Sequence, residues 1–351
     1  MSRESLFEKS EKERNYNELI GTDYFYGDKA KGDYRMAGGE IVHPRFILQD
    51  CRNNMFQPIL NEAIDYLSET KNNIKWWGCS ACGDDGSLPS RHLLSSQVAC
   101  INHLFPLRND FDAVLKIAQA VDPDITDVVL LENDVEGTRG YISFEVVSKE
   151  DHLNEDFRHI GKLDRGEMCT SIDAVIVGIK KDKRILLAIE WKYTESYDDT
   201  DKSKEDGNHP KGSMGSGNTR LKWYSSLILN SKQILRPATD NLRGSVYFFE
   251  PFYQLMRQTL WAEQMILHKD TEILKADDYV HVHVIPSANR DLLDKVYPAS
   301  GKRMEDTWRS CIIDQNKYRI ITPENLLAGI TGKNYEKFID YLQNRYWNGD
   351  K

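Results

Sequence analysis

The chain has 351 residues, with 46 Lys and Arg against 55 Asp and Glu, which gives a formal net charge of −9. Hydrophobic residues make up 40% and charged residues 29% of the chain, so it can build a sizeable core, and wholesale disorder is excluded. The sequence has no apolar run of the ~18 residues that a membrane helix needs, no signal-peptide core after Met1, and only 6 cysteines. We expect a cytoplasmic protein with no membrane partner, and the acidic balance excludes a uniformly basic nucleic-acid coat.

The N-terminal third is predicted to hold a polar arm followed by short helices. Residues 1–50 are polar and interrupted by glycines, which favours an arm with at most one short helix. Apolar residues at helical spacing then predict further helices, and Pro106 and Pro123 are expected to end two of them. The predicted helices cover 55–68, 91–107 and 111–121, with a loop over 79–89.

Strand-forming segments fill the middle of the chain. Runs of β-branched residues predict strands over 127–131 and 141–147, followed by a polar connection over 149–168. Two longer apolar runs, 171–179 and 184–193, are separated only by a short charged segment that is typical of a hairpin turn. We therefore expect an antiparallel pair of strands at the centre of a sheet.

The C-terminal part alternates again between helix and strand. Residues 196–251 are predicted to be a charged insertion that holds a helix over 220–235 and a strand or extended run over 245–249. A helix over 254–268, a strand over 279–286 and a helix over 335–347 follow. These elements predict one α/β domain over 1–351: a mixed central sheet flanked by helices, with its core at 91–195 and 252–290 and a C-terminal extension at 291–351.

Three polar side chains stand out on the predicted hairpin. The strand over 184–192 has apolar residues on one face, and Glu190 and Lys192 share the other face near its end. Its partner strand is apolar on both faces apart from Asp173. A tight antiparallel hairpin sets Asp173 opposite positions 190 and 191, which brings Asp173 and Glu190 within reach of one cation.

The chemistry of these residues favours metal-dependent hydrolysis of a phosphodiester. Two carboxylates at a buried strand end repel each other, and a divalent cation removes this repulsion. Mg²⁺ favours one or two carboxylates, with water and substrate phosphate in its remaining positions. Lys192 could then orient or deprotonate the attacking water and neutralise the charge that develops on the phosphate.

The arrangement resembles the PD-(D/E)XK nuclease superfamily, which includes many restriction endonucleases. The shared feature is an Asp on one strand of a hairpin, here Asp173, followed by Glu-x-Lys on the next, here Glu190-Trp191-Lys192. Four runs are also similar to bacterial restriction-endonuclease-like proteins: SSQVACINHLFPL, CTSIDAVIVG, AIEWKYTESY and QLMRQTLWAEQM. Ile172 departs from the pattern, because a proline often precedes the Asp in the superfamily.

The resemblance implies a core of αβββαβ order and an endonuclease that cuts DNA with Mg²⁺ or Mn²⁺ as its cofactor. It implies metal binding by Asp173, Glu190 and the backbone carbonyl of Trp191. It implies catalysis by the two carboxylates together with Lys192. A homodimer that cuts both strands is an arrangement that the sequence leaves open.

Further residues are candidates for auxiliary roles. The superfamily often uses a fourth acid, for which Glu145, Glu132 and Glu155 are candidates, with Gln97 as a non-acidic substitute. Glu145 can equally be a solvent-facing strand residue, and Gln97 a buried amide. Candidates for phosphate contacts, with ordinary helix surface as the alternative, are Arg257, Gln258, Arg220, Lys222 and Lys232.

Other patterns favour simpler interpretations. A second Glu-x-Lys, Glu69-Thr70-Lys71, is expected at a solvated helix end. Cys79-x-x-Cys82 lacks a second cysteine pair and is expected to be a loop with two free thiols rather than a zinc site. His281-x-His283 places two imidazoles on one strand face. A strand in which His and Val alternate is more often a half-exposed strand than a metal site, so we expect a half-exposed strand here.

Two other function classes remain open. A catalytically inactive nucleic-acid-binding or interaction protein of the same fold would suit the acidic charge, because duplex binding depends largely on phosphate neutralisation. The set of Asp173, Glu190 and Lys192 favours the enzyme, since a binding module has no need of it. A nuclease for RNA or branched DNA would keep the chemistry and change the substrate.

Overall fold

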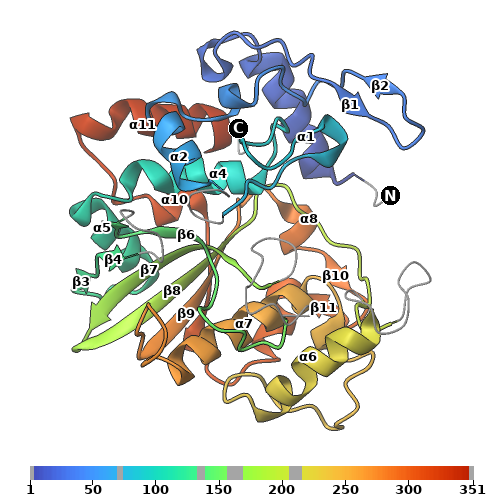
Figure 1. Ribbon diagram of the computed structural model, residues 1–351, viewed down its shortest axis with the longest axis vertical. Helices are drawn as coiled ribbons and strands as arrows, with labels where there is room; N and C mark the ends of the chain where they lie inside the picture. The colour runs from blue at the N-terminus through green and yellow to red at the C-terminus, as the bar shows by residue number, and fades with distance from the viewer. Residues whose placement is uncertain (1–3, 69–73, 133–138, 156–168, 205–215, 348–351) are drawn as a thin grey trace.

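A six-stranded mixed sheet forms the centre of the computed structural model (Figure 1). The structure describes residues 4–68, 74–132, 139–155, 169–204 and 216–347. The strands of the sheet are β3 (Asp127–Val128), β6 (Ser143–Val146), β7 (Ile172–Lys180), β8 (Lys183–Trp191), β9 (Asp278–Val284) and β12 (Tyr318–Ile321). Their order is β12-β9-β8-β7-β3, and β6 also pairs with β7. Strand β7 is antiparallel to its neighbours, whereas β8, β9 and β12 are parallel.

Helices cover both faces of this sheet (Figure 1). On one face, α4 (Ser96–Leu104) and α5 (Phe111–Val121) contact β7, and α4 also contacts β8. On the other face, α7 (Phe252–Leu267) contacts β8 and β9, and α6 (Gly217–Asn230) packs against α7. The α/β fold with a mixed central sheet flanked by helices, predicted from the sequence, is confirmed.

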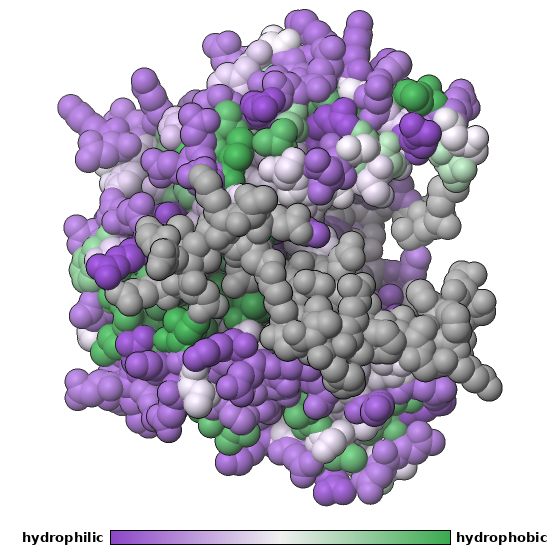
Figure 2. Space-filling model, viewed as in Figure 1, coloured by the Kyte–Doolittle hydropathy of each residue, from purple (hydrophilic) through white to green (hydrophobic). Residues whose placement is uncertain are grey.

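The remaining elements are short. The other α-helices are α1 (Leu6–Arg14), α2 (Leu60–Tyr66), α8 (Arg290–Leu293), α9 (Met304–Arg309), α10 (Pro323–Leu326) and α11 (Glu336–Leu342). Two-stranded sheets pair β1 (Tyr34–Arg35) with β2 (Ile41–Val42), β4 (Leu131–Glu132) with β5 (Arg139–Gly140), and β10 (Val296–Tyr297) with β11 (Lys302–Arg303). Hydrophilic side chains dominate the molecular face in Figure 2.

The β7–β8 hairpin determines where the candidate site lies. Apolar and β-branched residues fill both strands, and Lys181 and Asp182 turn the chain with φ values of 49° and 62°. Two-residue hairpin turns require such positive φ values. The register pairs Ala174 with Ile189. The tight hairpin predicted from the sequence is therefore confirmed, and it brings Asp173 next to the end of β8.

Apolar packing on both faces holds β8 in place. Leu187, Ile189 and Trp191 belong to the core on the α4 side of the sheet. The alternate residues, such as Ala188, belong to the core on the α7 side. Because side chains alternate along a strand, Glu190 shares the face of Ala188 and is directed toward α7.

Several element bounds differ from the sequence prediction. The helix predicted over 55–68 shortens to α2, because Pro58 lies in a 3₁₀ turn at Gln57–Ile59 that precedes it. Helix α4 begins at Ser96, since the hydroxyl of Ser95 caps it by accepting from a backbone N–H. The segment predicted as a strand or extended run over 245–249 contains a 3₁₀ turn at Val246–Phe248 instead.

The strands at both edges of the sheet also differ from the prediction. The two strands predicted over 127–131 and 141–147 shorten to β3 and β6. Strand β12 was not predicted, and it pairs in parallel with β9 from within the expected C-terminal extension. In the described part of the chain, no helix has the length and apolar character to cross a membrane.

Candidate active site

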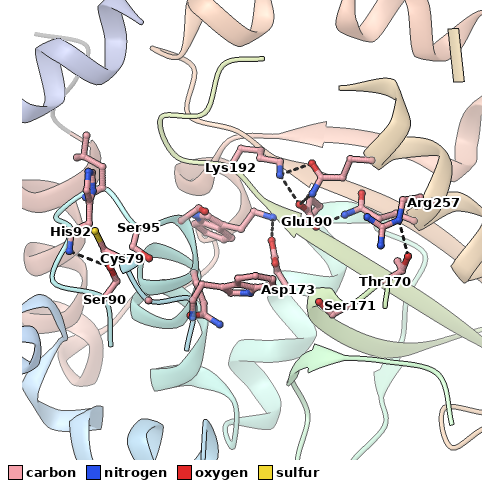
Figure 3. Close-up of a pocket in the computed structure, with 18 of the residues that line it drawn as sticks. Cys79, Ser90, His92, Ser95, Thr170, Ser171, Asp173, Glu190, Lys192 and Arg257 are labelled. Carbon is pink, nitrogen blue, oxygen red and sulfur yellow. Dashed lines mark hydrogen bonds and ion pairs between the residues drawn. The ribbon is translucent and has the colours of Figure 1, made fainter. Parts of the chain in front are cut away.

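Asp173, Glu190 and Lys192 line a single cavity of about 520 Å³ where β7 and β8 meet α4 and α7. Figure 3 shows Lys192 and Glu190 pointing toward each other, with Asp173 between them and the opposite wall of the cavity. The structure therefore brings together the three side chains that the sequence analysis singled out. They come from two adjacent strands, so the hairpin register fixes their spacing.

Asp173 is partly buried and anchored to the neighbouring strand. Its Oδ2 accepts a hydrogen bond from the backbone N–H of Trp191 at 2.7 Å. Burial raises the pKa of Asp173 well above its usual range, and the nearby carboxylates of Glu190 and Glu145 raise it further. The site thus concentrates negative charge around Asp173.

Glu190 and Lys192 form a buried ion pair that is held by α7. Both residues are less than a twentieth exposed, and Lys192 Nζ lies 2.6 Å from Glu190 Oε1. Gln254 bridges the pair, because its Nε2 donates to Glu190 Oε1 at 2.7 Å and its Oε1 accepts from Lys192 Nζ at 2.8 Å. Gln258, one turn further along α7, donates to Glu190 Oε2. Both oxygens of the Glu190 carboxylate therefore accept hydrogen bonds from side chains of this chain.

Lys192 carries its positive charge in this environment. Burial alone would favour the neutral amine, but the charge of Glu190 and further negative groups nearby outweighs it. The net result raises the pKa of Lys192 well above its ordinary value. The Lys192 ammonium is thus a fixed cation next to the carboxylates rather than a proton acceptor.

Glu145 is a buried member of the same group of acids. The β6–β7 register pairs Phe144 with Ala174 and Val146 with Ile172, so Glu145 lies across from Asp173. Its backbone has a φ of 51°, which is rare for a residue with a side chain and is concentrated at functional sites. Glu145 is therefore not the solvent-facing strand residue that the sequence left open.

The partners of Glu145 are uncharged. Gln97 donates to its Oε1 at 2.6 Å and the indole N–H of Trp77 does so at 3.2 Å, while Ser171 donates to its Oε2 at 3.2 Å. Burial raises the pKa of Glu145 to about 7 against the effect of these donors, and the charge of Glu190 adds to the rise. Gln97 is thus a buried amide that lines the cavity and holds Glu145.

Arg257 and Glu155 neutralise each other at the edge of the cavity. The guanidinium of Arg257 lies 3.2 Å from Glu155 Oε1, and its Nε also donates to Thr170 Oγ1 at 3.1 Å. Tyr224 donates to the same carboxylate from α6 at 2.5 Å. Glu155 is therefore bound within this cluster instead of facing Asp173. Arg257 and Gln258 both line the cavity and are not ordinary helix surface.

Other residues from the sequence analysis lie apart from the cavity. Arg220, Lys222 and Lys232 do not line it. Residues 69–71 and the side chain of Glu132 lie outside what the structure describes. Cys79 and Cys82, the two cysteines of the Cys-x-x-Cys pattern, are free thiols as the sequence analysis expected.

The prediction for His281 and His283 was wrong, because both are buried instead of half-exposed. Tyr318 of β12 covers them, and His283 Nδ1 lies 3.1 Å from its hydroxyl. Among the described residues, no group of three or more His, Cys, Asp or Glu side chains is arranged to hold a metal ion.

Sequence reasoning missed Gln254 and Trp77. Gln254 precedes Gln258 by one helical turn, so the helical spacing could have pointed to it. Trp77 lies in an irregular segment, and no periodic pattern in the sequence indicates that its indole reaches Glu145. Both residues contact the acids through hydrogen bonds that only tertiary packing brings about.

Comparison with known protein families identifies a relationship over most of the chain. Residues 14–347 match the model of a family described as Restriction Endonuclease associating with ARP (REase-ARP). No curated protein matches the chain. No solved structure matches it either. The family match spans nearly the whole chain and includes every residue of the cavity described above.

Proposed function

The chain belongs to the family of restriction endonucleases associating with ARP, and on that premise we propose that it is a metal-dependent endonuclease of the PD-(D/E)XK type that hydrolyses phosphodiester bonds of DNA. Asp173 and Glu190 bind the divalent cation, together with the backbone carbonyl of Trp191. Lys192 positions the attacking water and stabilises charge in the transition state. One observation carries the proposal: the two carboxylates and the ammonium line a single cavity at the ends of paired strands.

The donor set suits Mg²⁺ or Mn²⁺. Carboxylate and carbonyl oxygens are the hard ligands that these cations prefer. Asp173 is held near two other acids, and the resulting rise in its pKa reflects negative charge that a divalent cation would offset. Two carboxylates leave further metal positions for water and for an oxygen of the substrate phosphate.

The cation and the side chains of the site would have different roles in hydrolysis. A bound cation would supply positive charge that polarises the scissile phosphate. Lys192 adds a second positive charge within the same cavity, and its raised pKa favours orienting the water over deprotonating it. Gln254 and Gln258 fix the Glu190 carboxylate, so little reorganisation is needed when the reaction begins.

A second candidate function has one observation in its favour. The two cations that line the cavity, Lys192 and Arg257, are each paired with a carboxylate, and the chain as a whole has a net charge of −9. Little free positive charge is therefore present at the site to attract DNA phosphates. A protein of this fold that binds a partner without cutting nucleic acid would show the same pattern.

Incubation of the protein with nucleic acids separates these candidates. The substrates are plasmid, linear duplex, single-stranded and branched DNA and a single-stranded RNA, each with Mg²⁺, Mn²⁺ or EDTA. We expect DNA cleavage with either metal and none with EDTA. Lys192→Ala should lower the rate of cleavage by about 10²–10³-fold, whereas Lys180→Ala, which removes a surface cation from the far end of β7, should retain it.

The other outcomes are equally informative. If the wild type cuts no substrate with either metal, the endonuclease proposal is wrong. Binding of DNA without any cleavage would identify the second candidate. Cleavage of RNA or branched DNA alone would keep the chemistry and replace the substrate.

A further inference from the structure

We propose that Trp77 is the stacking platform of a pocket for one unpaired DNA base beside the phosphate that is cleaved. The inference rests on the proposed function for the position of that phosphate. It rests on the cavity itself for the position of the base. It specifies the substrate as DNA with a nucleotide that is single-stranded or has left the base stack.

Trp77 is an exposed ring that is held firmly in place. It is 44% exposed, whereas the other six tryptophans, all of which the structure describes, are buried or partly buried. Its backbone N–H donates to Gln97 Oε1 at 2.7 Å, and its indole N–H donates to Glu145 Oε1 at 3.2 Å. These bonds hold the backbone and one edge of the indole in place, while 44% of the residue stays exposed.

Gly78, the residue after Trp77, allows the backbone to pack closely against Asp84. A Cβ added to Gly78 would lie 2.8 Å from the Cβ of Asp84, closer than such atoms approach, so only glycine permits this packing. Asp84 in turn accepts from the backbone N–H of Cys79 at 3.0 Å and pairs with Arg91 at 2.9 Å. The position of Trp77 is therefore built into the loop.

Trp77 stands between two open spaces. It lines the cavity of about 520 Å³ that contains Asp173, Glu190 and Lys192, and also an adjoining cavity of about 210 Å³. The larger volume falls within the range of small-ligand pockets. A flat aromatic ligand favourably covers an exposed aromatic ring that lines a cavity, because stacking removes apolar surface from solvent.

The cavity that Trp77 lines also contains neutral hydrogen-bonding groups. Ser90, His92, Ser95 and Ser96 line the larger cavity, and burial lowers the pKa of His92 to about 4, so its imidazole is neutral. Figure 3 shows Cys79, Ser90, His92 and Ser95 together on the side of the cavity that lies away from Glu190 and Arg257. One side of the cavity is thus charged and suits phosphate and metal, and the other is neutral and suits the edges of a base.

A base can occupy this side only after leaving a duplex stack. Enzymes that bind a single base in a pocket act on single strands or flip the nucleotide out of the helix. Stacking on an aromatic side chain tolerates any base, because every base has an aromatic face. The pocket therefore selects an unpaired nucleotide more than it selects a sequence.

The test compares aromatic and non-aromatic side chains at position 77. The probe is a short mixed-sequence DNA single strand with a fluorescent adenine analogue, and EDTA prevents metal-dependent cleavage. Both Trp77→Phe and Trp77→Ala lose the N–H donor to Glu145, but only Trp77→Phe keeps an aromatic face. We expect Trp77→Ala to bind at least about 10-fold more weakly than Trp77→Phe, and to lose the quenching of the analogue. Trp77→Leu keeps an apolar side chain and should behave as Trp77→Ala does.

A matched pair at Trp223 on α6, which does not line either cavity, controls for general effects of losing an indole. Trp223→Phe and Trp223→Ala should bind the probe equally. Equal binding by Trp77→Ala and Trp77→Phe would overturn the proposal, as would a wild type that binds a fully paired duplex as tightly as the single strand. Tighter binding of the matching RNA would overturn its assignment to DNA.

The outcome also separates this inference from the proposed nuclease. Binding that depends on an aromatic residue at position 77, by a protein that cuts nothing, would support the base pocket and remove the nuclease. Metal-dependent cleavage of DNA by a protein in which Trp77→Ala and Trp77→Phe bind the probe equally would support the nuclease and remove the base pocket.

Discussion

Glu190 and Glu145 are both buried carboxylates at the same end of the sheet, yet their surroundings differ. Glu190 accepts from the charged Lys192 and from two glutamine amides of α7. Among its described partners, Glu145 accepts hydrogen bonds only from uncharged groups, and burial raises its pKa to about 7. Asp173 lies near both acids, and its pKa is also raised.

The difference indicates where a cation has its largest effect. Lys192, Gln254 and Gln258 already compensate much of the charge of Glu190, so a bound cation would change that carboxylate less. The pKa values of Asp173 and Glu145 are both raised, although the charge of Lys192 opposes the rise at Asp173, so a cation bound by Asp173 and Glu190 would most favour the ionised form of these two raised acids. Glu190 and these two acids should therefore respond differently to substitution, to pH and to metal.

Lys192→Met should produce the largest effect, because it leaves Glu190 buried and without its cation. We expect the free energy of unfolding in EDTA to fall by about 3–5 kcal/mol, as is typical when one partner of a buried ion pair is removed. Cleavage should fall by about 10²–10³-fold, since a positive charge at the reacting phosphate is lost. Denaturant unfolding and a cleavage assay measure the two effects.

Adding Mg²⁺ and comparing with Lys180→Met test whether the effect of Lys192→Met comes from the lost charge next to Glu190. Saturating Mg²⁺ should recover part of the lost stability, because the cation replaces the missing charge next to Glu190. Lys180→Met removes a partly exposed cation from the other end of β7 and should change the free energy of unfolding by less than about 1 kcal/mol. Equal losses in Lys192→Met and Lys180→Met would show that the buried pair does not stabilise the site.

Glu145→Gln should produce a smaller effect that depends on pH. In the folded state Glu145 binds its proton up to a pKa of about 7, against an ordinary value of 4.5, so the folded state holds more protons between these pH values. The stabilising effect of protonation is full below pH 4.5 and is lost as pH rises through about 7. The wild type should lose up to about 1.4 kcal/mol per pH unit relative to Glu145→Gln across this window.

Parallel unfolding measurements in EDTA at several pH values test this expectation. Mg²⁺ should make the difference in unfolding free energy between wild type and Glu145→Gln depend less on pH, because positive charge near Asp173 also lowers the pKa of Glu145. Stability curves of wild type and Glu145→Gln that stay parallel from pH 4.5 to 7 would place the titrating group elsewhere.

The sequence was sufficient to predict the central hairpin and the meeting of Asp173, Glu190 and Lys192. Both follow from local rules: residues two apart share a strand face, and a tight turn fixes the register between strands. The surroundings of Glu145 could not be predicted in this way. Its positive φ departs from the regular strand, and three segments distant in sequence supply its hydrogen-bond donors Trp77, Gln97 and Ser171.

Contacts between distant segments explain the other failures. His281 and His283 alternate with valines and were expected to be half-exposed, but β12 pairs with β9 and Tyr318 covers both imidazoles. Trp77 escaped notice because irregular segments carry no periodic signal, and its position depends on the packing of Gly78 against Asp84. Burial by a distant element is a property of the folded chain that local patterns do not contain.

Calorimetric titration of Mn²⁺ into the protein tests the central claim most directly. We expect the wild type to bind the cation, and we expect Asp173→Asn and Glu190→Gln each to abolish the binding heat. Asp278→Asn, which removes a surface carboxylate paired with Lys317, should bind as the wild type does. Binding that is unchanged in Asp173→Asn and Glu190→Gln, or absent from the wild type, would contradict the claim that these two carboxylates hold the metal.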